Sequence, residues 1–174
     1  MADEGNIISN LNLDGDAAGG PVPNGEDTMP AIGLISQYVK DLSVENPNAP
    51  ESYQWTEAPE IGVDFNISAR TIQPEIHEIE LKVNVTAKTS QGSLYLVELV
   101  YCGLIGIRNV PEEQAHAFLF AEAPRLLFPF ARAVVADAVR DAGFQPLMID
   151  PIDFVGLYRQ QRQRGEAAAQ QTPA

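Results

Sequence analysis

The side chains best suited to chemistry in this sequence are one cysteine and two histidines, Cys102, His77 and His116. A single cysteine cannot form an internal disulfide, and a nucleophilic thiolate needs a neighbouring base. Nothing in the sequence brings either histidine to Cys102, which sits inside an apolar run where cysteine is typically a small buried hydrophobe. His77 falls in the apolar row of a strand and His116 within a helix, where lone histidines are usually structural. The sequence does not indicate a cysteine-based enzyme.

Paired carboxylates are the other candidates for catalysis. Glu112-Glu113 follow Pro111, a pattern typical of a helix start, because acids are favourable near the positive end of the helix dipole. Glu78 and Glu80 lie with Lys82 on the strand row expected to face water. The sequence contains no glycine-rich phosphate loop, no metal-binding Cys/His spacing and no Gly-x-Ser-x-Gly elbow. We therefore expect a protein that is not an enzyme, with no catalytic residues, metal or cofactor.

Aromatic residues point to binding instead. Tyr53, Trp55, Phe65 and Tyr95 fall near loops or strand ends rather than in a helical stripe. Aromatic groups with few charges between them accept many apolar side chains with little demand on shape. They can equally be core or oligomer residues, which we favour for Phe65. Trp55, in a loop bounded by prolines, is harder to assign to a core.

The charge of the chain excludes some partners. It carries 24 acidic and 11 basic residues, a net charge of −13. Nucleic acid and anionic membrane surfaces are disfavoured, because both require clustered Lys and Arg. An acidic surface attracts basic partners, although a merely solvated surface has the same composition. No apolar run approaches the ~20 residues that span a bilayer, and the first residues are acidic, unlike a secretory signal. We expect a cytoplasmic protein with no direct membrane insertion.

Composition divides the chain into three parts. Residues 1–30 carry six acids and no bases and contain few apolar residues, so we expect a disordered acidic arm. Residues 165–174 are expected to form a disordered tail, and residues 31–164 to form one domain. The basic residues Arg159, Arg162 and Arg164 come just before that tail.

Alternation of apolar and polar residues predicts four strands, at residues 34–45, 61–68, 76–88 and 93–107. In the first, Tyr38, Leu42 and Val44 are expected on one side, and Val39, Asp41, Ser43 and Glu45 on the other. Short loops favour an antiparallel sheet with one face covered. The fourth strand is apolar on both faces, which favours subunit contact and a site for visiting chains, unless it is a central strand covered by the helices and the arm.

The helical period begins after the fourth strand. Helices are predicted from Pro111 to about Glu122, from Arg125 to Asp141, and from Ile152 to about Gln163. Pro124 should interrupt the first two, and Leu127, Phe130, Val134 and Ala138 should form the apolar stripe of the second. Four strands followed by helices predict an α+β fold, with the helices packed on one face of the sheet.

Several segments resemble, in order, the signature of the SecB protein-export chaperones. The first is Tyr38-Val39-Lys40-Asp41-Leu42-Ser43-Val44-Glu45-Asn46-Pro47-Asn48-Ala49-Pro50. Next come Leu81–Ala87, Gly103-Leu104-Ile105 and Pro124–Arg132, followed by Gly143–Leu147 and Pro151–Phe154. The resemblance covers roughly residues 34–160.

This resemblance implies a homotetramer, a dimer of dimers, that binds unfolded precursor proteins and delivers them to the SecA motor ATPase. It implies a SecA-binding surface at Asp41, Glu45, Leu96 and Glu98, which the strand pattern places in two pairs, each on one face. It also implies a client-binding groove at Trp55 and Tyr95, and an effect on tetramer assembly at Val97, Leu99 and Tyr101. The tetramer would hold clients without ATP, by many weak contacts along one unfolded chain.

Two other functions remain open at this point. One is a small-molecule enzyme, such as a thioesterase, on a hot-dog-like oligomeric sheet. That fold wraps its sheet around a long helix early in the chain, whereas the helices predicted here follow all four strands. The other is a structural oligomerisation module, which would not suppress client aggregation.

Overall fold

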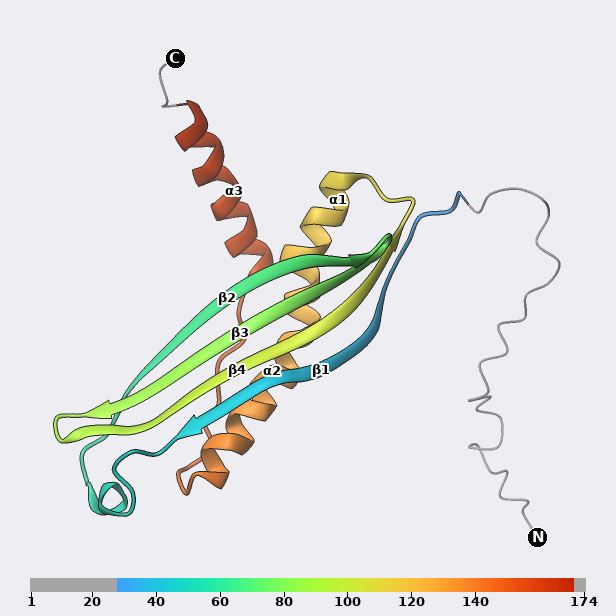
Figure 1. The fold of residues 1–174 in the computed structure, drawn as a ribbon. Helices are drawn as coiled ribbons and strands as arrows, with labels where there is room; N and C mark the ends of the chain where they lie inside the picture. The colour runs from blue at the N-terminus through green and yellow to red at the C-terminus, as the bar shows by residue number, and fades with distance from the viewer. Residues whose placement is uncertain (1–27, 171–174) are drawn as a thin grey trace, which may run out of the picture.

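The structure, a computed structural model, describes residues 28–170, with side chains described as far as Glu166. Its strands are β1 (Ala31–Glu45), β2 (Glu60–Gln73), β3 (Ile76–Thr89) and β4 (Gly92–Arg108). They form one antiparallel sheet in the order β1-β4-β3-β2, so β4 is a central strand (Figure 1). A short 3-10 helix, η2 (Glu51–Gln54), lies between β1 and β2. The predicted four-stranded antiparallel sheet is confirmed.

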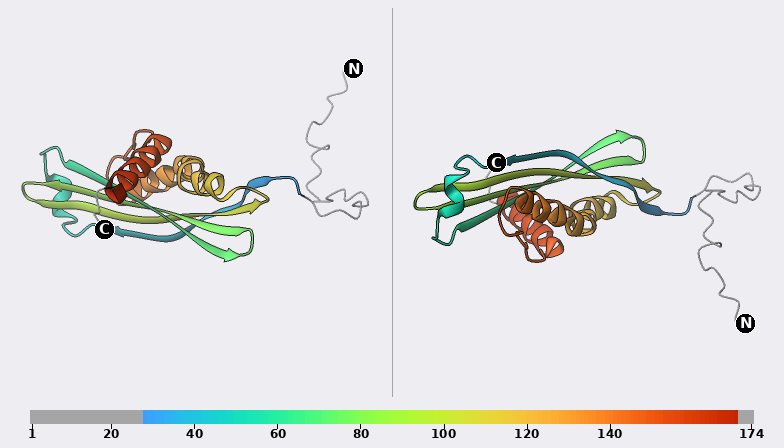
Figure 2. Two further views of the ribbon diagram at one scale, coloured as in Figure 1. Left: turned by 90° about the horizontal axis from the view of Figure 1, so that it is seen from above. Right: turned by 90° about the horizontal axis from the view of Figure 1, so that it is seen from below.

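The other helices follow β4 and lie against one face of the sheet (Figure 2). They are α1 (Glu112–Ala117), the π-helix η3 (Phe118–Glu122), α2 (Ala123–Asp141) and α3 (Phe154–Gln170). The core lies between this helix face and α2, where fully buried residues such as Leu81, Val83 and Leu99 meet Leu127 and Val135. We call the opposite side, which none of the helices in residues 28–170 covers, the open face. The predicted α+β layering is confirmed.

Strand β1 departs from simple alternation. Register shifts separate Leu34 from Ser36 and Val39 from Asp41, so one extra residue lies in β1 at each place. Because directly paired residues share a face, Tyr38 lies with Asp41 on the open face, and Val39 lies with Leu42 on the helix face. The prediction that Tyr38 shares a side with Leu42 is therefore wrong. Because of the extra residue at Lys40, residues of β1 before the bulge lie on the opposite faces from those that simple alternation with Leu42 would give.

Pro124 does not separate two helices. The π-helix η3 runs directly into α2, with Pro124 in the first turn of α2. Proline has no N–H to donate and crowds the carbonyl one turn earlier, and the wider π turn accommodates both features. The predicted stripe of α2 is also displaced. Leu127 is buried, but Phe130 is 50% exposed, and the buried row continues through Ala131, Val135 and Val139.

Helix α3 begins later and ends later than predicted. The Asp153 carboxylate accepts a 2.9 Å hydrogen bond from the Gly156 backbone N–H and so caps the first turn. A Cβ at position 156 would meet the Asp153 carboxylate. Residues 165–170, predicted as disordered tail, are helical.

The predicted acidic arm falls almost wholly on residues 1–27, outside the described residues. None of the described helices is long and apolar enough to cross a membrane.

Candidate binding surfaces

The acidic end of the open face is formed by Asp41, Glu45, Leu96 and Glu98. The register pairs Glu45 with Leu96, Ser43 with Glu98, and Asp41 with Val100, so all four lie on the open face across β1 and β4. The three carboxylates are exposed, and Leu96 is half-buried between them. Among the described residues none of the three carboxylates has an ion-pair partner. The four residues form a continuous surface that is negative with an apolar centre.

A network of charged side chains occupies the middle of the open face. The carboxylate of Glu78 on β3 accepts hydrogen bonds from the Tyr38 hydroxyl, from Lys40 Nζ at 3.1 Å and from Arg70 Nε at 2.5 Å. Lys40 also pairs with Glu80. These contacts join β1 to β3 across β4, and β2 to its neighbour β3. We call this set, with Glu78 at its centre, the Glu78 network.

Glu78 is only 2% exposed, although it lies on the uncovered face. The Arg70 guanidinium, with Tyr38 and Lys40, lowers the pKa of Glu78 to about 2 against the opposing effect of burial. The hydrogen bond to Glu78 raises the pKa of Tyr38 to about 12, since a tyrosinate beside a carboxylate is unfavourable. The alternation placed Glu78 on a wet surface. It could not show that three long side chains from other strands fold over it.

Cys102 lies beneath this network and is fully buried. Its sulfur and the carboxylates of Glu78 and Glu80 lie within 4.8 Å of one another, a spacing that metal ligands can have. The two carboxylates are already neutralised by Lys40 and Arg70. Burial, with the nearby carboxylates, raises the pKa of the Cys102 thiol to about 11, so it stays protonated near neutral pH. The cluster fits an ionic network rather than a metal site.

The helix face carries the three residues predicted to affect assembly. Val97 and Leu99 are 0% exposed and Tyr101 is 6% exposed, so they are core residues of this chain. Because helices of the same chain cover them, they face its own core, and their effect on assembly stays a prediction. The same face of β1 is only partly covered, however. Val39, Leu42 and Val44 pair with Tyr101, Leu99 and Val97 and are 43%, 41% and 40% exposed. We call these three residues the β1 apolar row.

Aromatic residues gather where the β1–β2 connection meets the end of α2. The Tyr95 ring packs against Phe144 at 5.1 Å between centroids, and Phe144 packs against Tyr53 at 5.3 Å. The Tyr53 hydroxyl donates to the Ala142 carbonyl at 2.8 Å. Trp55 is half-buried near Gly92 at the β3–β4 turn. Of the predicted groove pair, Tyr95 is 4% exposed and so lies in the core, whereas Trp55 keeps an exposed surface.

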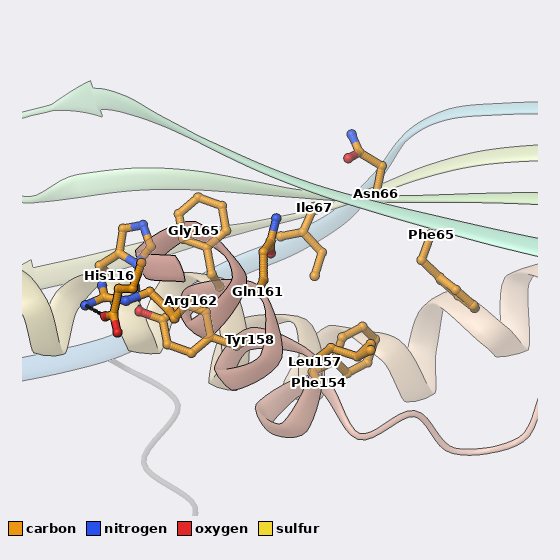
Figure 3. A pocket seen from close by; sticks show the side chains of 12 residues that line it. Phe65, Asn66, Ile67, His116, Phe154, Leu157, Tyr158, Gln161, Arg162 and Gly165 are labelled. Atoms are coloured by element: carbon orange, nitrogen blue, oxygen red, sulfur yellow. Dashed lines mark hydrogen bonds and ion pairs between the residues drawn. The ribbon is translucent and has the colours of Figure 1, made fainter. Parts of the chain in front are cut away.

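A second apolar site lies between β2 and α3, where a cavity of 630 Å³ opens (Figure 3). Phe120, Ile67 and Leu157 are among its apolar walls. A 2.8 Å hydrogen bond joins the Tyr158 hydroxyl and His116 Nδ1 at its polar end. Sequence reasoning missed this cavity, because it exists only through the packing of α3 beside η3. The complete lining is Phe65, Asn66, Ile67, His116, Phe120, Phe154, Leu157, Tyr158, Gln161, Arg162, Gly165 and Glu166.

Comparison with known proteins identifies the family of this fold. The family described as "Preprotein translocase subunit SecB" matches residues 25–165. The chain is 74% identical over 174 residues to the protein-export protein SecB of Novosphingobium aromaticivorans, covering 100% of this chain and 98% of that relative. The chain belongs to the SecB family. A second SecB, from Erythrobacter litoralis, is 60% identical over 167 residues, which cover 96% of this chain and 92% of the relative.

The solved structures agree with the fold. A SecB-like chaperone of Mycobacterium tuberculosis, in complex with a ChAD peptide from an antitoxin, has a TM-score of 0.59 at 12% identity. The match covers 70% of this chain and 90% of that chain. At this identity the likeness establishes the shared fold alone. Membership of the SecB family makes the chain a protein-export chaperone and not an enzyme, so the thioesterase alternative is rejected.

Proposed function

We propose that this chain acts in the cytoplasm as a homotetramer that holds unfolded precursor proteins without ATP and delivers them to SecA. The observation that carries the proposal is full-length similarity to SecB export proteins, together with an open face that gathers Asp41, Glu45, Leu96 and Glu98. A surface of three unpaired acids around a half-buried leucine suits a positively charged partner that also brings an apolar contact.

Unfolded clients would bind to surfaces other than the acidic end. Trp55, the half-exposed Tyr53 and the cavity beneath α3 offer apolar and aromatic area without a fixed shape, which suits varied unfolded chains. The aromatic and aliphatic part of the cavity wall is consistent with burial of client side chains. Several copies of these sites in a tetramer would add avidity along one long client. Tetramer assembly itself is supported by the exposed β1 apolar row on an edge strand.

Glu98→Lys tests whether docking and client holding use separate surfaces. Reversing one charge at the acidic end should weaken SecA binding by about tenfold or more at low salt, and the difference should shrink as salt is added. Suppression of aggregation of a slowly refolding client should stay at the wild-type level, at stoichiometric amounts. Asp150→Lys, which introduces the same charge at an exposed site of the loop before α3, is the control and should leave SecA affinity nearly unchanged. Loss of both activities in Glu98→Lys would contradict the assignment.

A further inference from the structure

A lysine lies beside the acidic end of the open face, where its positive charge should weaken the binding of a positively charged partner. Lys40 and Asp41 are neighbours in the chain, and in a regular strand they would lie on opposite faces. The bulge between Val39 and Asp41 changes this. Asp41 pairs with Val100 on the open face, and Lys40 contacts Glu78 and Glu80 on the same face. A positive charge therefore lies beside a surface that gains its binding strength from negative charge.

The Glu78 network draws Lys40 away from that surface. Tyr38 and Lys40 lie on edge strand β1, and Glu78 lies on β3, so both side chains cross β4 to reach it. They cross at Cys102, which pairs with Tyr38 on one side and with Glu80 on the other. A cysteine is small enough to lie beneath them. Lys40 is thus turned toward the middle of the sheet and away from Asp41.

The position of Glu78 is fixed by contacts that do not involve Lys40. Arg70 and Tyr38 each donate a hydrogen bond to it independently of Lys40, and its carboxylate is almost completely withdrawn from water. A charged group in that setting must remain paired, because an unpaired buried charge is strongly unfavourable. Lys40 is 37% exposed at its side chain and could otherwise adopt many conformations in solvent, including ones near Asp41.

We infer that Glu78 is a positioning residue of the docking surface, which sequesters Lys40 so that Asp41 stays unneutralised for a positively charged partner. The inference rests on the proposed docking of SecA at the acidic end. Glu78 does not touch the partner. It affects docking by holding the Lys40 side chain near β3. The same contacts tie β1 to β3 across β4.

The test is SecA affinity of the full chain at low salt, measured for Glu78→Gln, Lys40→Met and the double variant. Glu78→Gln should weaken SecA binding by about threefold, because Lys40 then keeps only the partly exposed Glu80 as an ion-pair partner and is freer to offset the charge of Asp41. Lys40→Met should bind at least as tightly as wild type. The double variant should return to the affinity of Lys40→Met, since no lysine remains to be released. Asp150→Asn controls for the loss of one negative charge elsewhere and should change affinity less than Glu78→Gln does.

The outcomes separate two kinds of failure. If Glu98→Lys leaves SecA binding intact, the docking surface itself is wrong. If Glu98→Lys weakens binding but Glu78→Gln does not, the sequestration of Lys40 is wrong while the docking surface stands. A purely structural role for Glu78 would leave the double variant as weak as Glu78→Gln, which would also overturn the inference. Lys40→Met keeps the test valid if Glu78→Gln folds poorly, because a binding loss in this variant contradicts an opposing role for Lys40.

Discussion

Glu78 is a charged residue whose burial links the fold to pH. Its pKa is lowered to about 2 from an ordinary value of 4.5, chiefly by Arg70. A group whose folded pKa is depressed contributes stability that is present above its unfolded pKa and is lost as the pH falls through the folded pKa. The contribution of Glu78 is therefore complete above about pH 4.5 and disappears on approach to pH 2.

We expect Glu78→Gln to flatten the acid dependence of stability. The free energy of unfolding of wild type should fall more steeply between about pH 4.5 and 2 than that of the variant, by a difference on the order of 1–3 kcal/mol. Chemical denaturation at several pH values measures the two curves. Asp150→Asn, at an exposed site, should follow wild type. Parallel curves for wild type and Glu78→Gln would show that the buried carboxylate contributes no pH-dependent stability.

Single residues also mark the limit of what the sequence could predict. The strand pattern put Asp41 with Glu45, and Leu96 with Glu98, each pair on one face, and the register brings both pairs to the same face of β1 and β4. Glu78 was assigned to a solvated row, because alternation describes one strand at a time. Its burial depends on Arg70 and Lys40, which come from two other strands and approach only after the sheet has formed.

In the proposed function, strand β1 takes part in both SecA docking and tetramer assembly. It is an edge strand with apolar side chains exposed on its helix face and acids on its open face. Edge strands that expose apolar residues are usually covered by another chain or protected by charge. Within the described part of this chain, the β1 apolar row is only partly covered. The row lies side by side with Val97, Leu99 and Tyr101 on the same face, so these buried residues would affect the proposed assembly by positioning it.

Leu42→Asp should break the tetramer into smaller species. A carboxylate in the middle of the β1 apolar row would have to be buried without a partner in the assembled form, which costs several kcal/mol. Sedimentation across a range of protein concentrations measures the change. Ser43→Asp is the matched control, since it introduces the same charge one residue further along β1 but on the open face. Equal disruption by both variants, or by neither, would contradict a contact through the helix face.

Elements were predicted well where one periodicity governed a whole segment. Strand β3 was expected at residues 76–88 and is observed at Ile76–Thr89. Errors arose at β-bulges and prolines, where the backbone leaves its regular period. The bulge at Lys40 exchanged the faces of Tyr38 and Val39, and η3 joined two helices that Pro124 was expected to separate. Neither adjustment has a reliable pattern in a single sequence, because each depends on the tertiary contacts around it.

At the scale of the whole molecule, the layered fold assigns different chemistry to each side. The open face carries the acidic end and the Glu78 network, while the helix face carries the β1 apolar row and the cavity beneath α3. Two sides of one sheet can therefore serve two partners at once. A chaperone that passes a client to a motor needs this arrangement, since the motor must be able to dock while the client is still held.

The most direct test of the central claim is native mass spectrometry of the full chain, alone and with a chemically unfolded, slowly refolding client. We predict a mass of four chains, increasing by one client chain when the client is diluted from denaturant and staying constant with the folded client. A single-chain mass, or a tetramer that gains no unfolded client, would contradict the account of this protein as an oligomeric holder of unfolded chains.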